Sequence, residues 1–450
     1  MKREKRLFKP IKLAILLTIA VVMSVGCSSI GSEPEEAEQT IKVLYYDEAS
    51  FYSQYGTIFS ALYPNINIEV ISTSVIPYEE GKDMDKPVME LIANEKPDVL
   101  FLGTNQYKQL AGEGNLYDLD TLIAESKYDL TGIAPGVVDY IKSLSGGKLY
   151  GMAPSYYGKA VYYNKDLFTK HNIPFPEDRM SWESLIQLAE RFPAHEGSED
   201  RTYGLKAMYS KNLLSLGKEM GIAQGLSFVN GTSKQLTVNT DAWKTVFASA
   251  LKAVQSKSLY WEEEQAPAMV SYEDYLLRDP FISGKVAMVI EGYPFINNIK
   301  RSQAAHKEKV VQNWDAVTAP VDPLNPDVRS NDSIFELFAI NASTTNPEAA
   351  WKFVGYVTGD EYARANAKSA YTNPIRMKYI NDNEGHNLQA FYAIKPVISL
   401  FDQEMSKMPK DFHRKLSDHM QPELKKAADG DQSVSDSLDT IQTSGQLLLE

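Results

Sequence analysis

The sequence predicts an α/β protein with two hydrophobic cores, and three observations support this class. Short apolar runs alternate with helical patterns over residues 41–102, which is the order typical of a parallel sheet covered by helices. Gly and Pro surround the aromatic pair Tyr156-Tyr157, which favours an extended crossing over a tight turn. Roughly 410 residues follow the N-terminal segment, and a chain with 43% hydrophobic residues can fill two sizeable cores.

The first 26 residues are expected to be an export signal. Six basic residues lead into an apolar run over residues 13–23, and small residues follow at 24–26. The run is shorter than the roughly 20 residues of a comfortable membrane span. Cys27, the single cysteine, comes directly after the expected cleavage point, which resembles a bacterial lipobox and implies a lipidated thiol (diacylglycerol and palmitate). The alternative is an uncleaved membrane anchor with an incidental cysteine.

Residues 27–40 are polar and acidic, which predicts a disordered tether that begins at the lipidated Cys27. The folded body then contains no cysteine, so disulfides and thiol-based metal or redox sites are excluded. Loss of the basic signal changes the net charge from −13 to about −18. Such acidity repels phosphate backbones and argues against nucleic-acid binding.

The body is expected to begin with a strand at 41–46, followed by a helix over 51–62 and a second strand at 66–71. Another helix around 88–92 leads to a third strand at 99–102. Ligands of parallel sheets lie outside the carboxyl ends of the strands. The polar and aromatic residues at those ends are candidate ligand contacts: Tyr46, Asp47 and Asn105.

Later elements follow the same logic. Ser181, Thr240 and Asn346 are expected to start amphipathic helices, because each is a capping residue followed by an acidic side chain or by Pro. The remaining expected elements are a strand and helix start over 161–168, a Gly-bounded strand over 281–290, a crossing at 316–320, a strand over 334–340, a loop over 371–376 and mostly helical sequence from there to the end.

A series of short motifs resembles the family 1 extracellular solute-binding proteins, the receptors of ATP-driven importers, including the maltose/maltodextrin-binding type. The motifs occur in order along residues 41–450: Pro97-Asp-Val, Gly114-Asn-Leu-Tyr-Asp-Leu, Gly147-Lys-Leu-Tyr-Gly, Tyr163-Asn-Lys-Asp-Leu-Phe, Ser181-Trp-Glu-Ser-Leu, Phe281-x-x-Gly-Lys-Val-Ala-Met and Asn346-Pro-Glu-Ala-Ala-Trp-Lys-Phe. Each is weak alone, and the order of seven makes the resemblance specific.

The resemblance implies a two-lobe, periplasmic-binding-protein-like (type II) fold with a ligand cleft between the lobes and several hinge crossings. Lobe one would comprise 41–154 plus 322–368, and lobe two 155–321 plus 369–450, with crossings near 154–158, 319–323 and 369–374. It further implies a monomeric receptor on the extracellular face of the bacterial membrane. This receptor would close around its solute and present the closed form to the membrane subunits of an ABC permease.

A sugar ligand requires flat aromatic surfaces and planar polar groups. Candidates for these roles, beside the strand-end residues, are Tyr156, Tyr157, Trp261, Glu291, Tyr293, Asn331, Asp332, Tyr371 and Arg376. Tyr45 and Tyr46 alternate along a strand, so one of them should face the core. Tyr293 stands where relatives carry a stacking Trp. Trp261 suits a cleft rim or a packed loop anchor, and Arg376 suits an acidic sugar's carboxylate or a structural salt bridge.

Motifs of enzymes are missing from the sequence. It has no Gly-x-Ser-x-Gly elbow, no His-Glu-x-x-His and no phosphate-binding Gly-rich loop, and we expect neither a cofactor nor a metal. The leading hypothesis is a lipid-anchored receptor for an oligosaccharide. Two alternatives stay open: a surface-tethered carbohydrate-active hydrolase with two cleft carboxylates, and a receptor of the same fold for a non-sugar solute such as a peptide.

Overall fold

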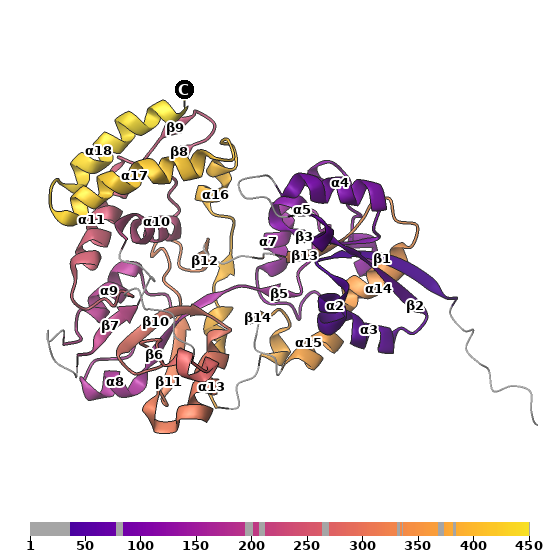
Figure 1. The fold of residues 1–450 in the computed structure, drawn as a ribbon, viewed down its shortest axis with the longest axis horizontal. Coiled ribbons are helices and arrows are strands. Elements are labelled where there is room, and N and C mark those ends of the chain that lie inside the picture. The colour runs from indigo at the N-terminus through magenta and orange to yellow at the C-terminus, as the bar shows by residue number, and fades with distance from the viewer. Residues whose placement is uncertain are drawn as a thin grey trace, which may run out of the picture.

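The computed structural model describes residues 37–77, 84–193, 201–206, 212–262, 270–330, 334, 336–367, 373–380 and 384–449. The predicted signal and most of the tether, with Cys27, lie outside these residues, as do the candidates Asn331, Asp332 and Tyr371. Figure 1 shows two α/β lobes side by side, joined by several chain segments. The expected α/β two-lobe architecture is therefore confirmed.

The first lobe is built on a five-stranded sheet. Its order is β2 (Ile66–Ser72), β1 (Gln39–Tyr45), β3 (Val99–Gly103), β13 (Glu336–Ile340) and β4 (Gly151–Met152). The first three strands are parallel, as their alternation with helices predicts. Strand β13 returns from late in the sequence and lies antiparallel between β3 and β4.

Helices cover both faces of this sheet, with α4 and α5 above it and α2 and α3 below it in the view of Figure 1. The elements are α2 (Glu48–Phe51), a π-helical turn (Tyr52–Gly56), α3 (Thr57–Leu62), α4 (Asp85–Glu95), α5 (Thr104–Gly112), α6 (Asp120–Glu125), α7 (Val137–Leu144), α14 (Pro347–Val357) and α15 (Asp360–Asn366). Helix α14 buries Trp351 and Phe353, as its apolar spacing predicts, and Phe353 packs against Phe338 of the sheet.

The second lobe is built on a four-stranded sheet. Its order is β11 (Trp314–Thr318), β6 (Lys159–Asn164), β10 (Val286–Gly292) and β7 (Tyr203–Lys206). The predicted strand over 281–290 begins only at Val286, because the Asp279 carboxylate accepts the amide protons of Phe281 and Ile282 and holds a turn there. Residues 316–318, expected in a crossing, are paired with β6 instead.

Most helices of the second lobe lie above and beside its sheet (Figure 1). They are α8 (Lys165–Lys170), α9 (Trp182–Ala189), α10 (Leu213–Ala223), α11 (Asp241–Gln255), α12 (Tyr272–Leu276), α13 (Phe295–His306), α16 (Leu400–Met405), α17 (Phe412–Asp429) and α18 (Val434–Gly445). Ser181 and Thr240 cap α9 and α11 through their hydroxyl oxygens, as predicted. No helix in the described part of the chain is long and apolar enough to cross a membrane.

The crossings between the lobes pair with one another. Short strand β5 (Ser155–Tyr156) lies antiparallel to β14 (Asn373–Pro374), and β12 (Val328–Arg329) lies parallel to β15 (Lys395–Pro396). Residues 375–380 then follow the first lobe, since the Ile375 carbonyl accepts from the Ala134 amide at 2.7 Å and the Met377 amide donates to the Gly132 carbonyl at 3.1 Å. The predicted division assigns these residues to lobe two, so the contacts favour a later crossing there.

Candidate functional site

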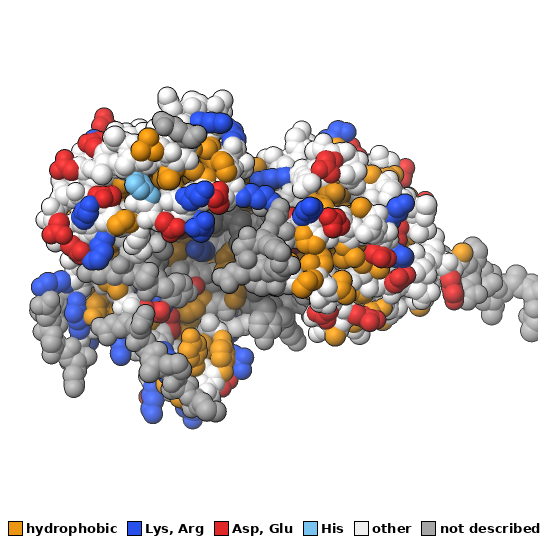
Figure 2. Space-filling view, turned by 45° about the horizontal axis from the view of Figure 1, so that its top comes forward, with side chains coloured by type: hydrophobic (Ala, Val, Ile, Leu, Met, Phe, Trp, Pro, Cys, Tyr) orange, Lys and Arg blue, Asp and Glu red, His pale blue; other side chains and the backbone are white. Residues whose placement is uncertain are grey.

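The carboxyl ends of β1 and β3 meet at a cavity of about 400 Å³ in the first lobe. Its lining residues are Tyr45, Tyr46, Thr73, Asp85, Val88, Phe101, Gly103, Thr104, Asn105, Gln106 and Glu336. We call this space the strand-end cavity. Two of the predicted contacts, Tyr46 and Asn105, line it, and its volume is in the range of small-molecule sites. Figure 2 shows a hollow between the lobes, with hydrophobic side chains on the surface of the first lobe that borders it.

Strand alternation decides which tyrosine reaches this cavity. Tyr45 is 3% exposed and packs in the core, whereas Tyr46 is 52% exposed, which confirms that one of the pair faces inward. The Tyr46 ring rests edge-on against Phe101, with the ring centroids 5.3 Å apart. Its hydroxyl donates to Glu336 Oε1 at 2.9 Å. Partial burial and the charge of Glu336 raise the pKa of Tyr46 to about 12, so the ring presents a neutral hydroxyl.

Asp47, the third predicted contact in this region, serves the fold. Its carboxylate caps α2 by accepting the Ser50 amide proton at 2.8 Å and the Ser50 hydroxyl at 2.7 Å. These hydrogen bonds hold the pKa of Asp47 below its usual value. The capping role accounts for the acidic residue directly after β1, and Asp47 does not line the strand-end cavity.

The strand-end cavity is also lined by polar residues that were not among the predicted contacts, including Asp85, Gln106 and Glu336. The Gln106 side chain accepts the Gly103 amide proton and donates to Asp85 Oδ1 at 3.0 Å, so it fixes the start of α5 beside the cavity. Glu336 opens an otherwise apolar strand, and that isolated charge is the signal that could have identified it.

A hydrogen-bonded group of tyrosines continues from this cavity toward α15. The Tyr45 hydroxyl donates to Gln54 Oε1 at 2.9 Å, and Gln54 Nε2 donates to the Tyr55 hydroxyl at 3.0 Å. The Tyr55 ring stacks on Tyr362 with centroids 5.2 Å apart. Gln54 and Tyr362 in turn line a second cavity, so the two cavities share one polar wall.

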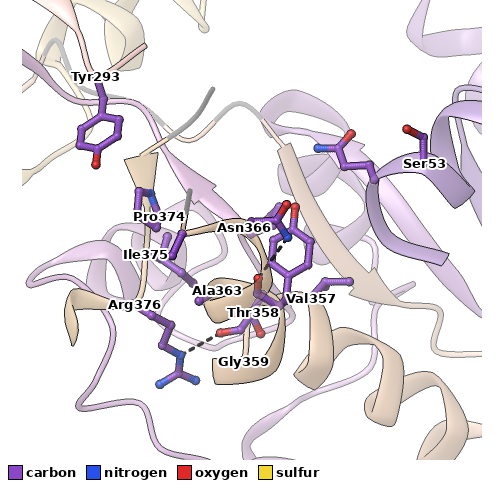
Figure 3. Close-up of a pocket in the computed structure, with 14 residues that line it drawn as sticks. Ser53, Tyr293, Val357, Thr358, Gly359, Ala363, Asn366, Pro374, Ile375 and Arg376 are labelled. Carbon is purple, nitrogen blue, oxygen red and sulfur yellow. Dashed lines mark hydrogen bonds between the residues drawn. The ribbon is translucent and has the colours of Figure 1, made fainter. Parts of the chain in front are cut away.

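The second cavity, about 380 Å³, lies between α15, the β14 segment and the second lobe. Its lining residues are Ser53, Gln54, Pro154, Tyr293, Val357, Thr358, Gly359, Tyr362, Ala363, Asn366, Ala367, Pro374, Ile375 and Arg376. We call it the crossing cavity. In Figure 3 the Tyr293 ring stands across from the residues of α15 and β14. Because both lobes line this cavity, a relative movement of the lobes would change its width.

Arg376 lines the crossing cavity, but its guanidinium is engaged with the first lobe. Nε donates to the Thr358 carbonyl at 2.9 Å (Figure 3), Nη1 donates to the Asp129 carbonyl at 2.6 Å, and the guanidinium carbon lies 4.9 Å from the centre of the Tyr128 ring. The side chain is almost fully buried, and the Asp129 and Asp360 carboxylates lie at 3.8 and 4.0 Å. Of the two roles predicted for Arg376, this geometry favours the structural one.

On the second lobe, the predicted contacts Tyr157 and Tyr293 lie beside the crossings. Tyr156 is 2% exposed and belongs to the core, whereas Tyr157 is 38% exposed. The Tyr157 hydroxyl lies so close to Gly292 that a Cβ built there would be 3.2 Å from it. Partial burial and the nearby charge of Glu291 raise the pKa of Tyr157. Tyr293 is buried edge-on against Phe391, with centroids 5.4 Å apart.

Trp261 lies apart from both cavities. Its ring packs on the second-lobe core, and its Nε1 is buried without a hydrogen-bond partner among the described residues. Its neighbour Glu262 accepts from the buried Lys206 ammonium at 2.8 Å, and Asp279 accepts from it at 3.1 Å. These contacts favour the loop anchor, the second of the two roles predicted for Trp261.

The family model described as "Bacterial extracellular solute-binding protein" matches residues 34–364. The chain belongs to this family. Membership confirms the resemblance inferred from the motifs, and it confirms the expectation of a receptor over an enzyme. Within the described residues, no group of three or more His, Cys, Asp or Glu side chains could hold a metal ion.

Several relatives cover most of this solute-binding protein. The maltodextrin-binding protein MdxE of Bacillus subtilis (strain 168) is 23% identical over 372 residues, which are 80% of this chain and 79% of MdxE. A binding protein of Brucella abortus (strain 2308) is 22% identical over 386 residues, 83% of this chain and 85% of its own.

Solved structures agree on the fold of this solute-binding protein. The sugar-binding protein MalE of Xanthomonas citri superimposes with a TM-score of 0.64 at 17% identity, covering 91% of this chain and 97% of its own. A Rhizobium etli sugar transporter protein in an open conformation also gives 0.64, at 19% identity, covering 91% and 99%. Similarity at this level of identity supports the two-lobe fold alone.

Proposed function

We propose that this solute-binding protein captures a sugar or oligosaccharide between its lobes and delivers it to an ABC permease. The observation that carries the proposal is the strand-end cavity, where the half-exposed Tyr46 ring stands beside Asn105, Gln106 and Glu336. A flat apolar face next to planar hydrogen-bonding groups suits a sugar ring and its hydroxyls. MdxE, whose name refers to maltodextrin, supports the same ligand class.

Four residues form the core of the proposed binding surface: Tyr46 and Asn105 from the first lobe, and Tyr157 and Tyr293 from the second. Glu291, Asn331, Asp332 and Tyr371 stay as predicted contacts, while the described contacts of Asp47, Tyr156, Trp261 and Arg376 favour structural roles. The lobes would follow the predicted division, with residues 375–380 moved to lobe one.

A thermal-shift screen tests the ligand class. The purified protein is melted with neutral, acidic and cationic saccharides, polyols and peptides. A ligand at 100 times its dissociation constant adds about 2.7 kcal/mol to stability, which gives a clear rise in melting temperature. A rise with one saccharide class and no hydrolysis of it supports the proposal. A rise in melting temperature with peptides alone would contradict the sugar ligand and favour a peptide solute. Hydrolysis of a glycan by the protein would favour the alternative of a carbohydrate-active hydrolase.

We further propose that the receptor is anchored to the outer face of the bacterial membrane through a lipid on Cys27. The support is the order of basic residues, apolar run and small residues before the single cysteine. Cells expressing the full chain are fed an alkyne-tagged palmitate, and the protein is isolated and probed for the tag. Label on the wild type and none on Cys27→Ser is the expected result. Equal label on both, or none on either, would contradict the anchor.

A further inference from the structure

Glu336 is a carboxylate in the wall of the strand-end cavity that has no cationic partner among the residues that the structure describes. It is half-buried at the first position of β13, where Tyr46, Tyr45, Tyr55 and Tyr362 surround it closely enough for its charge to raise their pKa values. Its Oε1 accepts the Tyr46 hydroxyl proton at 2.9 Å. No Lys, Arg or His in the described part of the chain forms an ion pair with it, and Oε2 has no hydrogen-bond partner there.

A carboxylate placed in this way can accept further hydrogen bonds from a ligand in the cavity. An ionised carboxylate only accepts hydrogen bonds, and its partial burial removes part of its water shell. Glu336 faces a cavity of about 400 Å³ whose other polar residues include Asn105 and Asp85. Sugar hydroxyls or an ammonium group would supply the donors, and hydrogen bonds to a charged acceptor are stronger than neutral ones.

The charges around both cavities disfavour an anionic ligand. The described residues that line the strand-end cavity include two carboxylates, Glu336 and Asp85, and no cation. Among the described residues that line the crossing cavity the one cation is Arg376, which donates to the carbonyls of Thr358 and Asp129. A ligand carboxylate would therefore meet like charge at one cavity and an already engaged guanidinium at the other, which costs binding energy.

We propose that Glu336 is a ligand-binding residue that accepts hydrogen bonds from an uncharged or cationic saccharide, and that it selects against acidic saccharides. This inference rests on the proposed sugar-receptor function and names the charge class that the cleft takes. Tyr46, beside its place in the proposed binding surface, also positions Glu336, because its hydroxyl donates to one carboxylate oxygen and leaves the other to the ligand.

Titration calorimetry of the wild type and of Glu336→Gln tests the inference. The probes are maltotetraose and cellotetraose (neutral), the glucosamine tetramer (cationic) and tetragalacturonate (anionic). Glu95→Gln is the matched control, because Glu95 is exposed at the end of α4 and lines neither cavity. Glu336→Gln should bind the neutral or cationic probe about tenfold to a hundredfold more weakly, with no loss of melting temperature in the ligand-free protein.

The ratio of neutral to anionic affinity is the decisive readout, since a purely structural role would not move it. Glu336→Gln should narrow that ratio by at least about tenfold, and Glu95→Gln should leave it unchanged. Two outcomes would overturn the inference without contradicting the proposed sugar-receptor function. One is unchanged affinity of Glu336→Gln for the bound probe. The other is wild-type binding of tetragalacturonate as tight as that of the neutral probes. Failure of every saccharide to bind the wild type would overturn the sugar function itself, and this inference with it.

Discussion

At the scale of single residues, the proposed binding surface includes one member of each of two pairs of adjacent tyrosines that differ in burial. In Tyr45-Tyr46 and in Tyr156-Tyr157 the first ring is buried and the second reaches the surface. Both pairs lie at the end of a strand, where alternate side chains point to opposite faces. The sequence therefore predicts that each pair divides its roles, and neighbouring contacts decide which ring is exposed.

Removal of the exposed ring on the second lobe should weaken ligand binding without unfolding the protein. We expect Tyr157→Ala to lower the affinity for the bound saccharide by about 2 kcal/mol, roughly 30-fold, because a buried aromatic anchor is lost from the complex. Calorimetric titration measures the affinity, and Tyr275→Ala is the control, since Tyr275 is an exposed tyrosine of α12 that is not among the predicted ligand contacts. An equal loss of saccharide affinity in both variants would contradict a ligand contact by Tyr157.

The tyrosine group should resist ionisation in the folded protein. Burial is the main cause that raises the pKa of Tyr46 and of Tyr362 to about 12, and burial also raises the pKa of Tyr45 and Tyr55. A folded pKa above the unfolded value of 10 means that the folded state binds more protons between pH 10 and 12, so stability is lost as the pH rises through this window.

An ultraviolet titration measures this effect. Between pH 10 and 11 we expect tyrosinate absorbance well below that of the protein unfolded in guanidinium, and denaturant midpoints should fall across the same range. In Glu336→Gln the pKa of Tyr46 should drop toward its usual value, because the neighbouring charge and hydrogen bond that raise it are weakened. Complete ionisation near pH 10 in the folded wild type would contradict the described burial.

At the scale of elements, Arg376 ties three segments of the first lobe together: the end of α14, the loop around Asp129 and the segment that follows β14. Arg376→Met should lower the free energy of unfolding by about 1.5–3 kcal/mol, because two carbonyls lose charged donors in a buried position. Chemical denaturation measures the loss, with Arg414→Met on the exposed face of α17 as control. A change in saccharide affinity without a change in stability would instead place Arg376 in the binding surface.

Strand β7 packs against α9 so closely that one glycine is required. A Cβ at Gly204 would lie 2.1 Å from the Ala189 carbonyl oxygen, whereas a Cβ at Gly112, at the end of α5, would meet nothing within 4 Å. We expect Gly204→Ala to cost about 1–3 kcal/mol through forced backbone movement, and Gly112→Ala to be neutral or slightly stabilising. Thermal melts of the two variants compare them directly, and similar melting temperatures would be inconsistent with this packing.

Some boundaries of helices and strands could be predicted from local sequence, and others could not. Helix starts at Ser181 and Thr240 were predictable because a hydroxyl caps the helix within a few residues. The turn over 279–285 was not, because the apolar residues Phe281 and Ile282 resemble strand sequence until the Asp279 carboxylate engages their amides. In the site, Tyr46 follows from its position at a strand end, whereas the pairing of Glu336 beside Gly103 depends on a contact between distant parts of the chain.

The whole molecule has two lobes that share contacts through the crossings, and one hydrophobic cluster runs from Val43 and Phe338 of the first sheet to Tyr162 and Trp314 of the second. Binding of a saccharide to both lobes would favour the state in which they lie closer together. We expect small-angle scattering to show a smaller radius of gyration at saturating saccharide. Glu336→Gln should need about tenfold to hundredfold more saccharide for the same decrease in radius. An unchanged radius in the saturated wild type would argue against closure.

The place of β13 in the first sheet has a consequence for the order in which the protein folds. The hydrogen bond from the Thr104 hydroxyl to the Ile334 carbonyl spans 230 residues of sequence, and the strand that follows fills the gap between β3 and β4. At about 5–20 residues per second, a ribosome needs roughly 10–50 seconds to make the intervening chain. During that time the nascent first lobe has two unjoined pieces of sheet, so this lobe cannot complete its sheet until nearly three quarters of the chain has been synthesised.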